Sequence, residues 1–201
     1  MLRETNICNL DYELSVKVNF FRYKQKVKSM EKFNINNRKG KSLPKEIQSL
    51  KAYMNGVKYL SIARLSEARY LKVMPYPHRE FQLSLSTAID TNYSFSCEMF
   101  LKSIIIFHEG NAHGHNLKIL YDQLPTDTKN LTKSQKMFSK ESLKIEFEEL
   151  LEMMGDSFVF FRYDNENTGY TTNLHFLRAF AEYLEIISFE IIKPYVKHGL
   201  Y

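Results

Sequence analysis

The sequence predicts an all-α protein, an up-and-down bundle of four long helices with one or two short ones. Glycine and proline are scarce, at 7 and 5 of 201 residues, so the chain has few tight turns and does not resemble a β-sandwich. Apolar residues recur at intervals of three and four over long stretches, which is the spacing of one buried helix face. The hydrophobic content of 44% is sufficient for a core.

The chain divides into a basic N-terminal appendage, residues 1–44, and a helical bundle, residues 45–201. The spacing of apolar residues predicts no particular secondary structure for the appendage. Basic residues with interleaved aromatic rings can bind single-stranded nucleic acid, whereas a charged run can also be a solvated linker. The basic residues are Lys24, Lys26, Lys28, Lys32, Arg38, Lys39 and Lys41, with Tyr23 and Phe33 among them.

The first two long helices have the clearest signals. One begins near Lys45, with Glu46 in its first turn, and runs to about Leu71, where prolines follow. Its apolar positions are Ile47, Leu50, Met54 and Val57. The second runs from about Arg79 to His108, and Gly110 is suited to a left-handed residue at its end.

The second half of the chain is predicted in shorter pieces. A short helix covers residues 117–123 and starts at His115 or Asn116. Two more long helices cover residues 143–154 and 172–193, and Pro194 is expected to end the last one. Between them, residues 126–140 are predicted as a loop with a weak helix, and residues 157–163 as either a strand or a helical turn.

Charge and cysteine content indicate which partners and which cellular compartment to expect for the protein. The formal charge of +5 is compatible with a phosphate-bearing partner. The two cysteines, Cys8 and Cys97, lie in unrelated contexts and indicate a reduced protein without disulfides. Because the sequence shows neither a signal peptide nor an apolar run long enough to cross a bilayer, we expect a cytoplasmic protein without a membrane partner.

Three short motifs occur in order along the predicted bundle. Glu98 and Lys102 form an E-x-x-x-K pair on an apolar helix, Gly114-His115-Asn116-Leu117 opens a short helix, and Phe161-Arg162-Tyr163 precedes the last helix. In this order and spacing, over residues 45–195, the motifs resemble those of the HEPN superfamily. That resemblance implies a helical bundle that forms a homodimer, as in toxin–antitoxin, CRISPR and phage-defence systems.

The resemblance also implies a catalytic pattern from which this chain departs. Many HEPN proteins are metal-independent ribonucleases with an Arg-x4-6-His motif at the dimer cleft. Here no histidine falls in that window after Arg162, and the next one, His175, lies 13 positions further on. Histidine is the side chain suited to proton transfer near neutral pH, so the nuclease site is predicted to be degenerate.

The candidate site residues follow from this chemistry. An arginine can hold phosphate oxygens with its planar fork, and an imidazole or a carboxylate can move the proton. The candidate catalytic residues are Arg162, His175 and Glu166, and the candidate binding residues are Arg162, Tyr163, Lys102 and His115.

Each candidate also has a structural alternative. Arg162 could form an ion pair with Glu98 or Glu166 that ties two helices together. Glu98 and Lys102, four residues apart, could be a solvated helix pair, and His115 could cap its helix. The last helix places His175, Arg178 and Glu182 on one face, which is either a solvated polar stripe or the face that brings His175 to Arg162.

No metal or other cofactor is expected. His108, His113 and His115 surround one turn, but apart from Glu109 no cysteine or carboxylate is placed to complete a four-ligand set around them.

We therefore expect a binding or regulatory module for RNA, a nucleotide phosphate or a protein partner such as an antitoxin. One alternative is an active ribonuclease toxin that uses Arg162 with His175 or Glu166. The other is a purely structural interaction protein.

Overall fold

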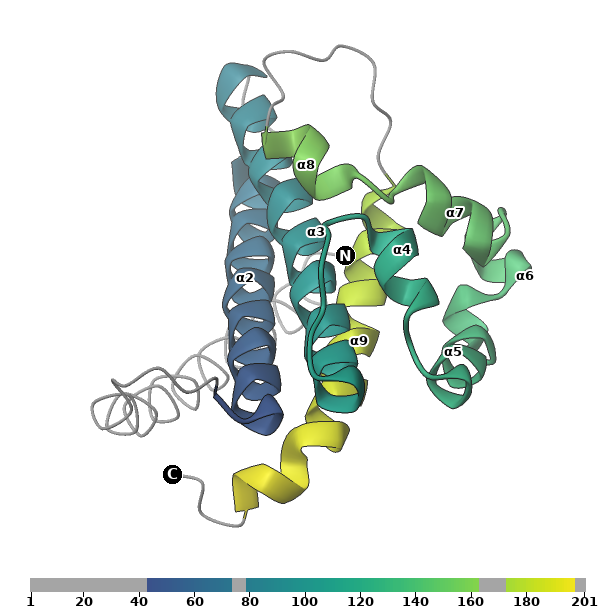
Figure 1. Cartoon of the computed structure of the whole chain (residues 1–201). Coiled ribbons are helices and arrows are strands. Elements are labelled where there is room, and N and C mark those ends of the chain that lie inside the picture. Colours follow the sequence, from purple (N-terminus) through teal and green to yellow (C-terminus); the bar gives the residue numbers. More distant parts are fainter. Residues whose placement is uncertain (1–42, 74–78, 163–172, 198–201) are drawn as a thin grey trace, which may run out of the picture. The chain divides into compact units, whose positions relative to one another are not determined.

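The computed structural model describes residues 43–73, 79–162 and 173–197, and within these ranges the chain is helical and contains no strand. The all-α prediction is therefore confirmed for the described residues. Figure 1 shows α2 (Lys45–Val73), α3 (Arg79–Glu109), α4 (Leu117–Asp122), α5 (Thr126–Lys133), a 3-10 turn (Lys136–Phe138), α6 (Lys140–Leu143), α7 (Phe147–Met153), α8 (Ser157–Arg162) and α9 (Leu174–Lys197). The predicted basic appendage lies outside the described residues, except for residues 43 and 44.

Helices α2 and α3 pack against each other in antiparallel directions (Figure 1). Small residues bring the two backbones close together. Ser49 and Ser103 are buried and exchange hydrogen bonds, each hydroxyl donating to the other residue's carbonyl oxygen at 2.7 and 2.9 Å. A Cβ atom on Gly56 would lie 2.6 Å from ring carbons of the buried Phe100. This approach fixes α3, which carries the Glu98 motif.

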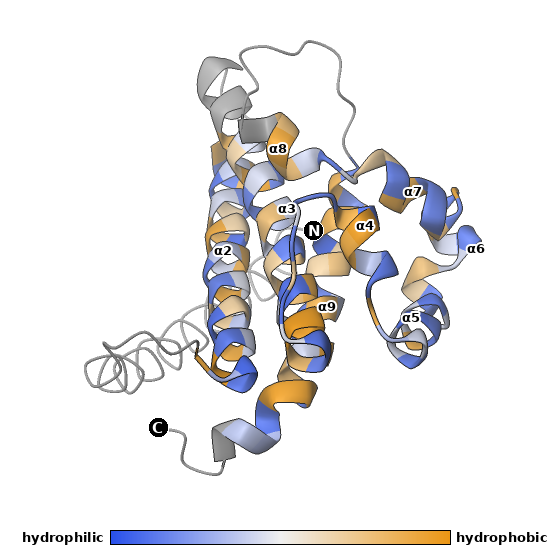
Figure 2. Ribbon diagram, in the orientation of Figure 1, coloured by the Kyte–Doolittle hydropathy of each residue, from blue (hydrophilic) through white to orange (hydrophobic). Residues whose placement is uncertain are grey.

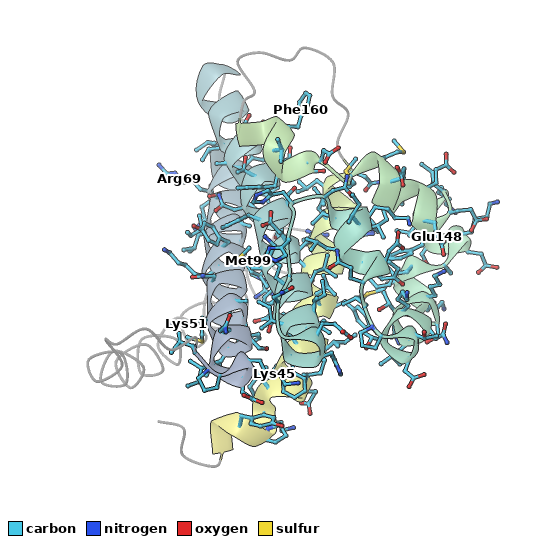
Figure 3. All side chains as sticks on the ribbon, viewed as in Figure 1. Lys45, Lys51, Arg69, Met99, Glu148 and Phe160 are labelled. Carbon is cyan, nitrogen blue, oxygen red and sulfur yellow. The ribbon has the colours of Figure 1, made fainter. Side chains whose placement is uncertain are left out.

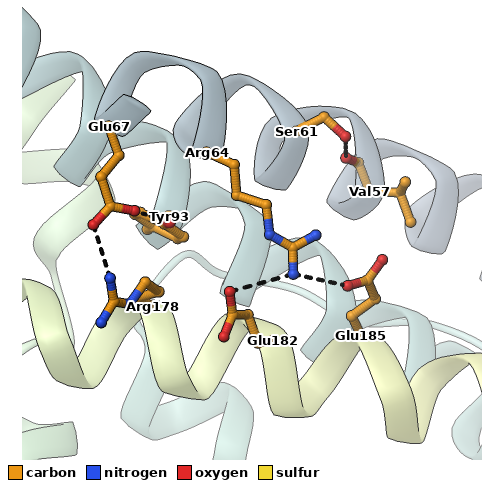
Figure 4. A network of polar contacts seen from close by, with 8 residues as sticks. All are labelled: Val57, Ser61, Arg64, Glu67, Tyr93, Arg178, Glu182 and Glu185. Atoms are coloured by element: carbon orange, nitrogen blue, oxygen red, sulfur yellow. Dashed lines mark hydrogen bonds and ion pairs between the residues drawn. The ribbon is translucent and has the colours of Figure 1, made fainter. Parts of the chain in front are cut away.

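Helix α9 lies against the α2–α3 pair. Ser188 of α9 donates a hydrogen bond to the carbonyl of Phe100 at 3.3 Å, and Cys97 contacts the carbonyl of Leu177. Burial raises the pKa of the Cys97 thiol well above its ordinary range. Ion pairs in the first half of α9 also tie this helix to α2 (Figure 4).

An aromatic cluster joins α4, the 3-10 turn and α7 to the first half of α9. Edge-to-face and tilted ring contacts hold it together, and such pairs stabilise a core beyond their buried area. Phe138 and Phe147 lie at its centre, with ring centroids 5.2 Å apart. The remaining members are Tyr121, Phe176, Phe180 and Tyr183. In Figure 2 helix α5 is mostly hydrophilic and α7 has both hydrophilic and hydrophobic residues, and Figure 3 labels Glu148 on this side.

Several predicted elements are confirmed. Helices α2 and α3 begin at the predicted residues and end within two residues of the predicted ends, because their periodic apolar faces are long. Gly110 has the expected left-handed backbone, with φ of +91°. The short helix α4 falls inside residues 117–123.

Two predicted elements are corrected. The long helix over residues 143–154 is broken, because Lys144 has a positive φ of 66° and ends α6 before α7 begins at Phe147. Of the two alternatives predicted for residues 157–163, the helical one is confirmed over residues 157–162. Pro194 lies inside α9, since a proline near a helix end removes only one hydrogen bond of the last turn.

Of the four long helices predicted between residues 45 and 201, three are therefore long in the structure: α2, α3 and α9. A membrane-spanning segment, which would need a long and continuously apolar helix, does not occur in the described part of the chain.

Candidate functional site

The carboxylate of Glu98 lies at the centre of the candidate site. Its side chain is completely buried in α3, with an exposed fraction of 0%. One oxygen, Oε1, accepts hydrogen bonds from Lys102 Nζ at 2.8 Å and from His115 Nδ1 at 3.0 Å. The other oxygen, Oε2, has no hydrogen-bond partner in the part of the chain that the structure describes. We call these three residues the Glu98 cluster.

Burial of Glu98 follows from the position of α3. The flanking residues Cys97, Phe100 and Leu101 are buried, so the carboxylate is surrounded by apolar side chains. A buried carboxylate persists only when it is paired, and Lys102 supplies the pair one turn along the same helix. The lysine side chain is only 15% exposed. The solvated surface pair considered from the sequence is therefore wrong, and the ion pair belongs to the interior.

His115 reaches Glu98 from the connection between α3 and α4. The residue after it, Asn116, caps α4 by accepting a hydrogen bond from the backbone N–H of Ile119 at 3.0 Å. The Asn116 amide also donates to Asp156 at 2.9 Å. The capping role considered for His115 is thus taken by Asn116, which leaves the imidazole available for Glu98.

The turn before α8 holds this connection in place. The carbonyl of Gly155 accepts a hydrogen bond from the backbone N–H of Leu117 at 2.7 Å. A Cβ atom on Gly155 would lie 2.7 Å from the Asn116 amide nitrogen and 3.1 Å from the carbonyl oxygen of Glu152, so a larger residue would have to displace the Asn116 side chain. The start of α8 and the His115–Asn116 segment are consequently fixed to each other.

Aromatic rings line one side of the Glu98 cluster. The ring centroid of Phe158, in α8, lies 6.0 Å from that of His115 and 4.3 Å from that of Phe95 in α3. Tyr59 of α2 continues the series against Phe95 at 4.3 Å. These four rings, which we call the aromatic column, run from α2 to the imidazole. The His115 side chain at its end is 56% exposed.

The geometry assigns the proton on His115. An ionised carboxylate only accepts hydrogen bonds, so Nδ1 carries a hydrogen in the contact with Glu98. The second ring nitrogen, Nε2, has no hydrogen-bond partner among the described residues. A half-exposed imidazole whose Nδ1–H is held by a buried carboxylate can accept or release a proton at Nε2.

The structure brings together two of the predicted binding residues, Lys102 and His115, on one carboxylate oxygen. Arg162 is the last residue of α8, four positions beyond Phe158, and its side chain lies outside the described part. The predicted Tyr163 and Glu166 also lie outside the described residues.

His175 is exposed in the first turn of α9. Its predicted pairing with Arg162 stays a prediction, because the Arg162 side chain is not described.

The other two residues of the predicted polar stripe face α2. Arg178 pairs with Glu67 at 2.9 Å, and Glu182 pairs with Arg64 at 3.3 Å (Figure 4). Glu67 also accepts a hydrogen bond from the hydroxyl of Tyr93 at 2.7 Å. The interpretation of Arg178 and Glu182 as a purely solvated stripe is thus corrected, since both connect α9 to α2.

Two residues at the site were not predicted from the sequence to be site residues. Glu98 was named only as part of a motif, and Phe158, whose ring contacts that of His115, was not singled out. The Gly-His-Asn-Leu motif was the available signal, because its asparagine is a strong helix cap and leaves the histidine outside the helix. Within the described ranges, no group of three or more histidine, cysteine and acidic residues is placed to hold a metal ion.

Comparison of the chain with models of protein families, with curated proteins and with solved structures finds no match.

Proposed function

We propose that the protein is a HEPN-like helical module that binds RNA or a nucleotide through its phosphate groups at the Glu98 cluster and Arg162. The observation that carries this proposal is the convergence of Lys102 and His115 on Glu98 beside α8, the helix that ends in Arg162. A phosphate is recognised by cations and N–H donors, and arginine is the side chain best suited to it.

The packing of α8 supports the inclusion of Arg162 in the proposed phosphate-binding site. This helix packs against α3, and its Phe158 ring contacts both His115 and Phe95. The backbone of Arg162 therefore follows one helical turn after a residue that touches the cluster. The net charge of +5 favours association with a polyanion.

The proposal extends to the setting that the resemblance implies. The module acts as a homodimer in a toxin–antitoxin or phage-defence system, and its further partner is an antitoxin or another protein. Growth arrest on induced expression, relieved by Arg162→Ala, is the expected cellular result. Growth unaffected by the wild-type protein counts against the toxin setting.

RNA binding tests the proposal directly. Fluorescence anisotropy with a labelled single-stranded RNA of about 16 nucleotides gives the affinity at about 50 and 200 mM salt. We expect Arg162→Ala to weaken binding and to reduce the salt slope by about one. Arg69→Ala is the matched control, because Arg69 is an exposed arginine on α2 (Figure 3). Equal affinity of the two variants, or no salt-sensitive binding by the wild type, contradicts the proposal.

A second candidate is a metal-independent ribonuclease. The contact of the His115 imidazole with a buried carboxylate favours it, since this arrangement suits proton transfer. The ribonuclease predicted from the sequence used His175 or Glu166 beside Arg162 for proton transfer. The Glu98 cluster offers His115 for this role instead.

A further inference from the structure

We propose that the outward face of α2 is a docking surface for an acidic amphipathic helix of a partner protein. The residues that form this surface take no part in the Glu98 cluster, so the inference does not depend on the proposed phosphate binding. The surface consists of six residues, which we call the outer stripe: Lys51, Asn55, Lys58, Ile62, Leu65 and Arg69.

The spacing of the six residues places them along one line on the helix. Successive members are four, three, four, three and four positions apart, which is the heptad spacing of a seam between two helices. All of them except Lys51 are exposed, whereas the opposite side of α2 packs against α3. Figure 3 shows Lys51 and Arg69 on the same side of α2. The outer stripe is therefore a continuous surface about five helical turns long.

The centre of the outer stripe is aliphatic. Ile62 and Leu65 are three positions apart and 37% and 51% exposed, so their side chains are neighbours on the surface. The flanking residues Ser61, Ser66 and Ala68 are small, which lets a second helix approach closely. Nucleic acids are bound mainly by phosphate contacts and by stacking on aromatic rings, neither of which buries an aliphatic pair. The centre therefore favours a protein partner over RNA.

Cations lie on both sides of this aliphatic centre, and the outer stripe has no acidic member. In the part of the chain that the structure describes, none of Lys51, Lys58 and Arg69 forms an ion pair. Glu67, the acidic residue nearest to Arg69 in the sequence, pairs with Arg178 of α9 instead. Because complementary charges select the partner at an interface, the partner helix should carry carboxylates beside its apolar residues.

The same charges disfavour a second copy of this chain as the occupant. From Lys58 to Arg69 the spacing of four, three and four positions is the same in both directions. An antiparallel copy would place Lys58 against Arg69, and a parallel copy would place each cation against its own equivalent. Like charges that face each other oppose pairing, so the homodimer of the proposed function uses another face. An acidic helix meets both cations in either direction.

A synthetic helical peptide of about 20 residues tests the proposal on the full chain. The acidic peptide has two leucines three positions apart at its centre and a glutamate four positions outside each leucine. By fluorescence anisotropy we expect saturable binding of this peptide and no binding of a basic peptide in which lysines replace the glutamates. Leu65→Glu should weaken binding at least about 10-fold. Leu131→Glu is the matched control, because Leu131 of α5 is 52% exposed, and it should leave the affinity unchanged.

A charge swap keeps the test independent of folding defects. The double variant Lys58→Glu and Arg69→Glu changes two exposed side chains, and circular dichroism should show that it remains folded. We expect it to lose the acidic peptide and to gain binding of the basic peptide. Lys136→Glu, a charge reversal at an exposed lysine of the 3-10 turn, should bind as the wild type does.

Three results overturn the proposal. The first is that the wild type does not bind the acidic peptide, or binds both peptides equally. The second is displacement of the acidic peptide by the RNA of about 16 nucleotides, which makes the outer stripe a nucleic-acid surface. The third is a dimer in sedimentation velocity that Leu65→Glu dissociates, which makes the outer stripe a contact between copies. Arg162→Ala should leave peptide binding unchanged, so failure of the proposed RNA binding is measured separately.

Discussion

Replacement of Gly56 by alanine tests how closely α2 and α3 approach each other. Gly56 lies in the middle of α2, where alanine is normally the better helix former. Helix propensity alone therefore predicts that Gly56→Ala stabilises the protein, by about 0.5–1 kcal/mol. The packing of the two helices predicts the opposite sign.

The magnitude follows from the space at this position. The new Cβ would lie 2.6 Å from two carbons of the Phe100 ring. Carbon atoms pack at about 3.5–4.0 Å, so the ring or the helices must move by about 1 Å. Phe100 is fully buried and contacts Tyr53 and α9, so the ring has little room to turn. Overpacking of this kind costs about 1–3 kcal/mol, and subtracting the propensity gain of about 0.5–1 kcal/mol leaves a net destabilisation of up to about 2.5 kcal/mol.

Urea denaturation followed by circular dichroism measures the free energy of unfolding of each variant. Asn55→Ala is the matched control, because Asn55 is the exposed neighbour on the same helix and also gains helix propensity. We expect Asn55→Ala to be neutral or stabilising and Gly56→Ala to be destabilising. If Gly56→Ala stabilises the protein as much as Asn55→Ala does, the inferred close approach of α2 and α3 is refuted.

Three further predictions concern the cap and the ion pairs. Asn116→Ala should lower the unfolding free energy by about 0.5–2 kcal/mol, measured by urea denaturation, because it removes the cap of α4; an unchanged midpoint would refute the cap. A hydrogen bond from Lys133 lowers the pKa of Glu148, so this carboxylate stabilises the fold at neutral pH, and the contribution is lost as the pH falls through its folded-state pKa. Glu148→Gln should therefore lose less stability on acidification than the wild type in thermal melts at several pH values, and parallel curves would count against the pair. A double-mutant cycle on Glu67 and Arg178, followed by urea denaturation, should give a coupling of up to about 1 kcal/mol that weakens with salt, whereas zero coupling at low salt would contradict the contact between α2 and α9.

The sequence predicted most of the helices, because periodic apolar faces are local signals. Helices α2 and α3 were placed almost correctly from the spacing of their apolar residues, and Gly110 marked the end of α3. The break at Lys144 was missed because a positive φ at lysine has no composition signal. The continuation of α9 through Pro194 was missed because a proline near a helix end is tolerated.

The candidate site was predictable only in part. Lys102 and His115 were named from motifs, but their convergence on one oxygen depends on Asn116 and on the turn at Gly155, 40 residues after His115. The complete burial of Glu98 depends on helices distant in the sequence, whereas a glutamate four residues before a lysine is usually a surface pair. Both features depend on contacts between elements that are distant in the sequence, which the local motifs do not specify.

The state of the His115 ring during RNA binding tests the central claim most directly. Imidazole resonances of His115 and His113 can be followed by NMR while the RNA of about 16 nucleotides is added to the full chain. The ring in the free protein should carry its proton on Nδ1, and the His115 resonances should move with RNA while those of the exposed His113 stay in place. A proton on Nε2 of the free neutral ring, or His115 resonances that remain fixed while RNA binds, would contradict the assignment of the Glu98 cluster as the phosphate-handling site.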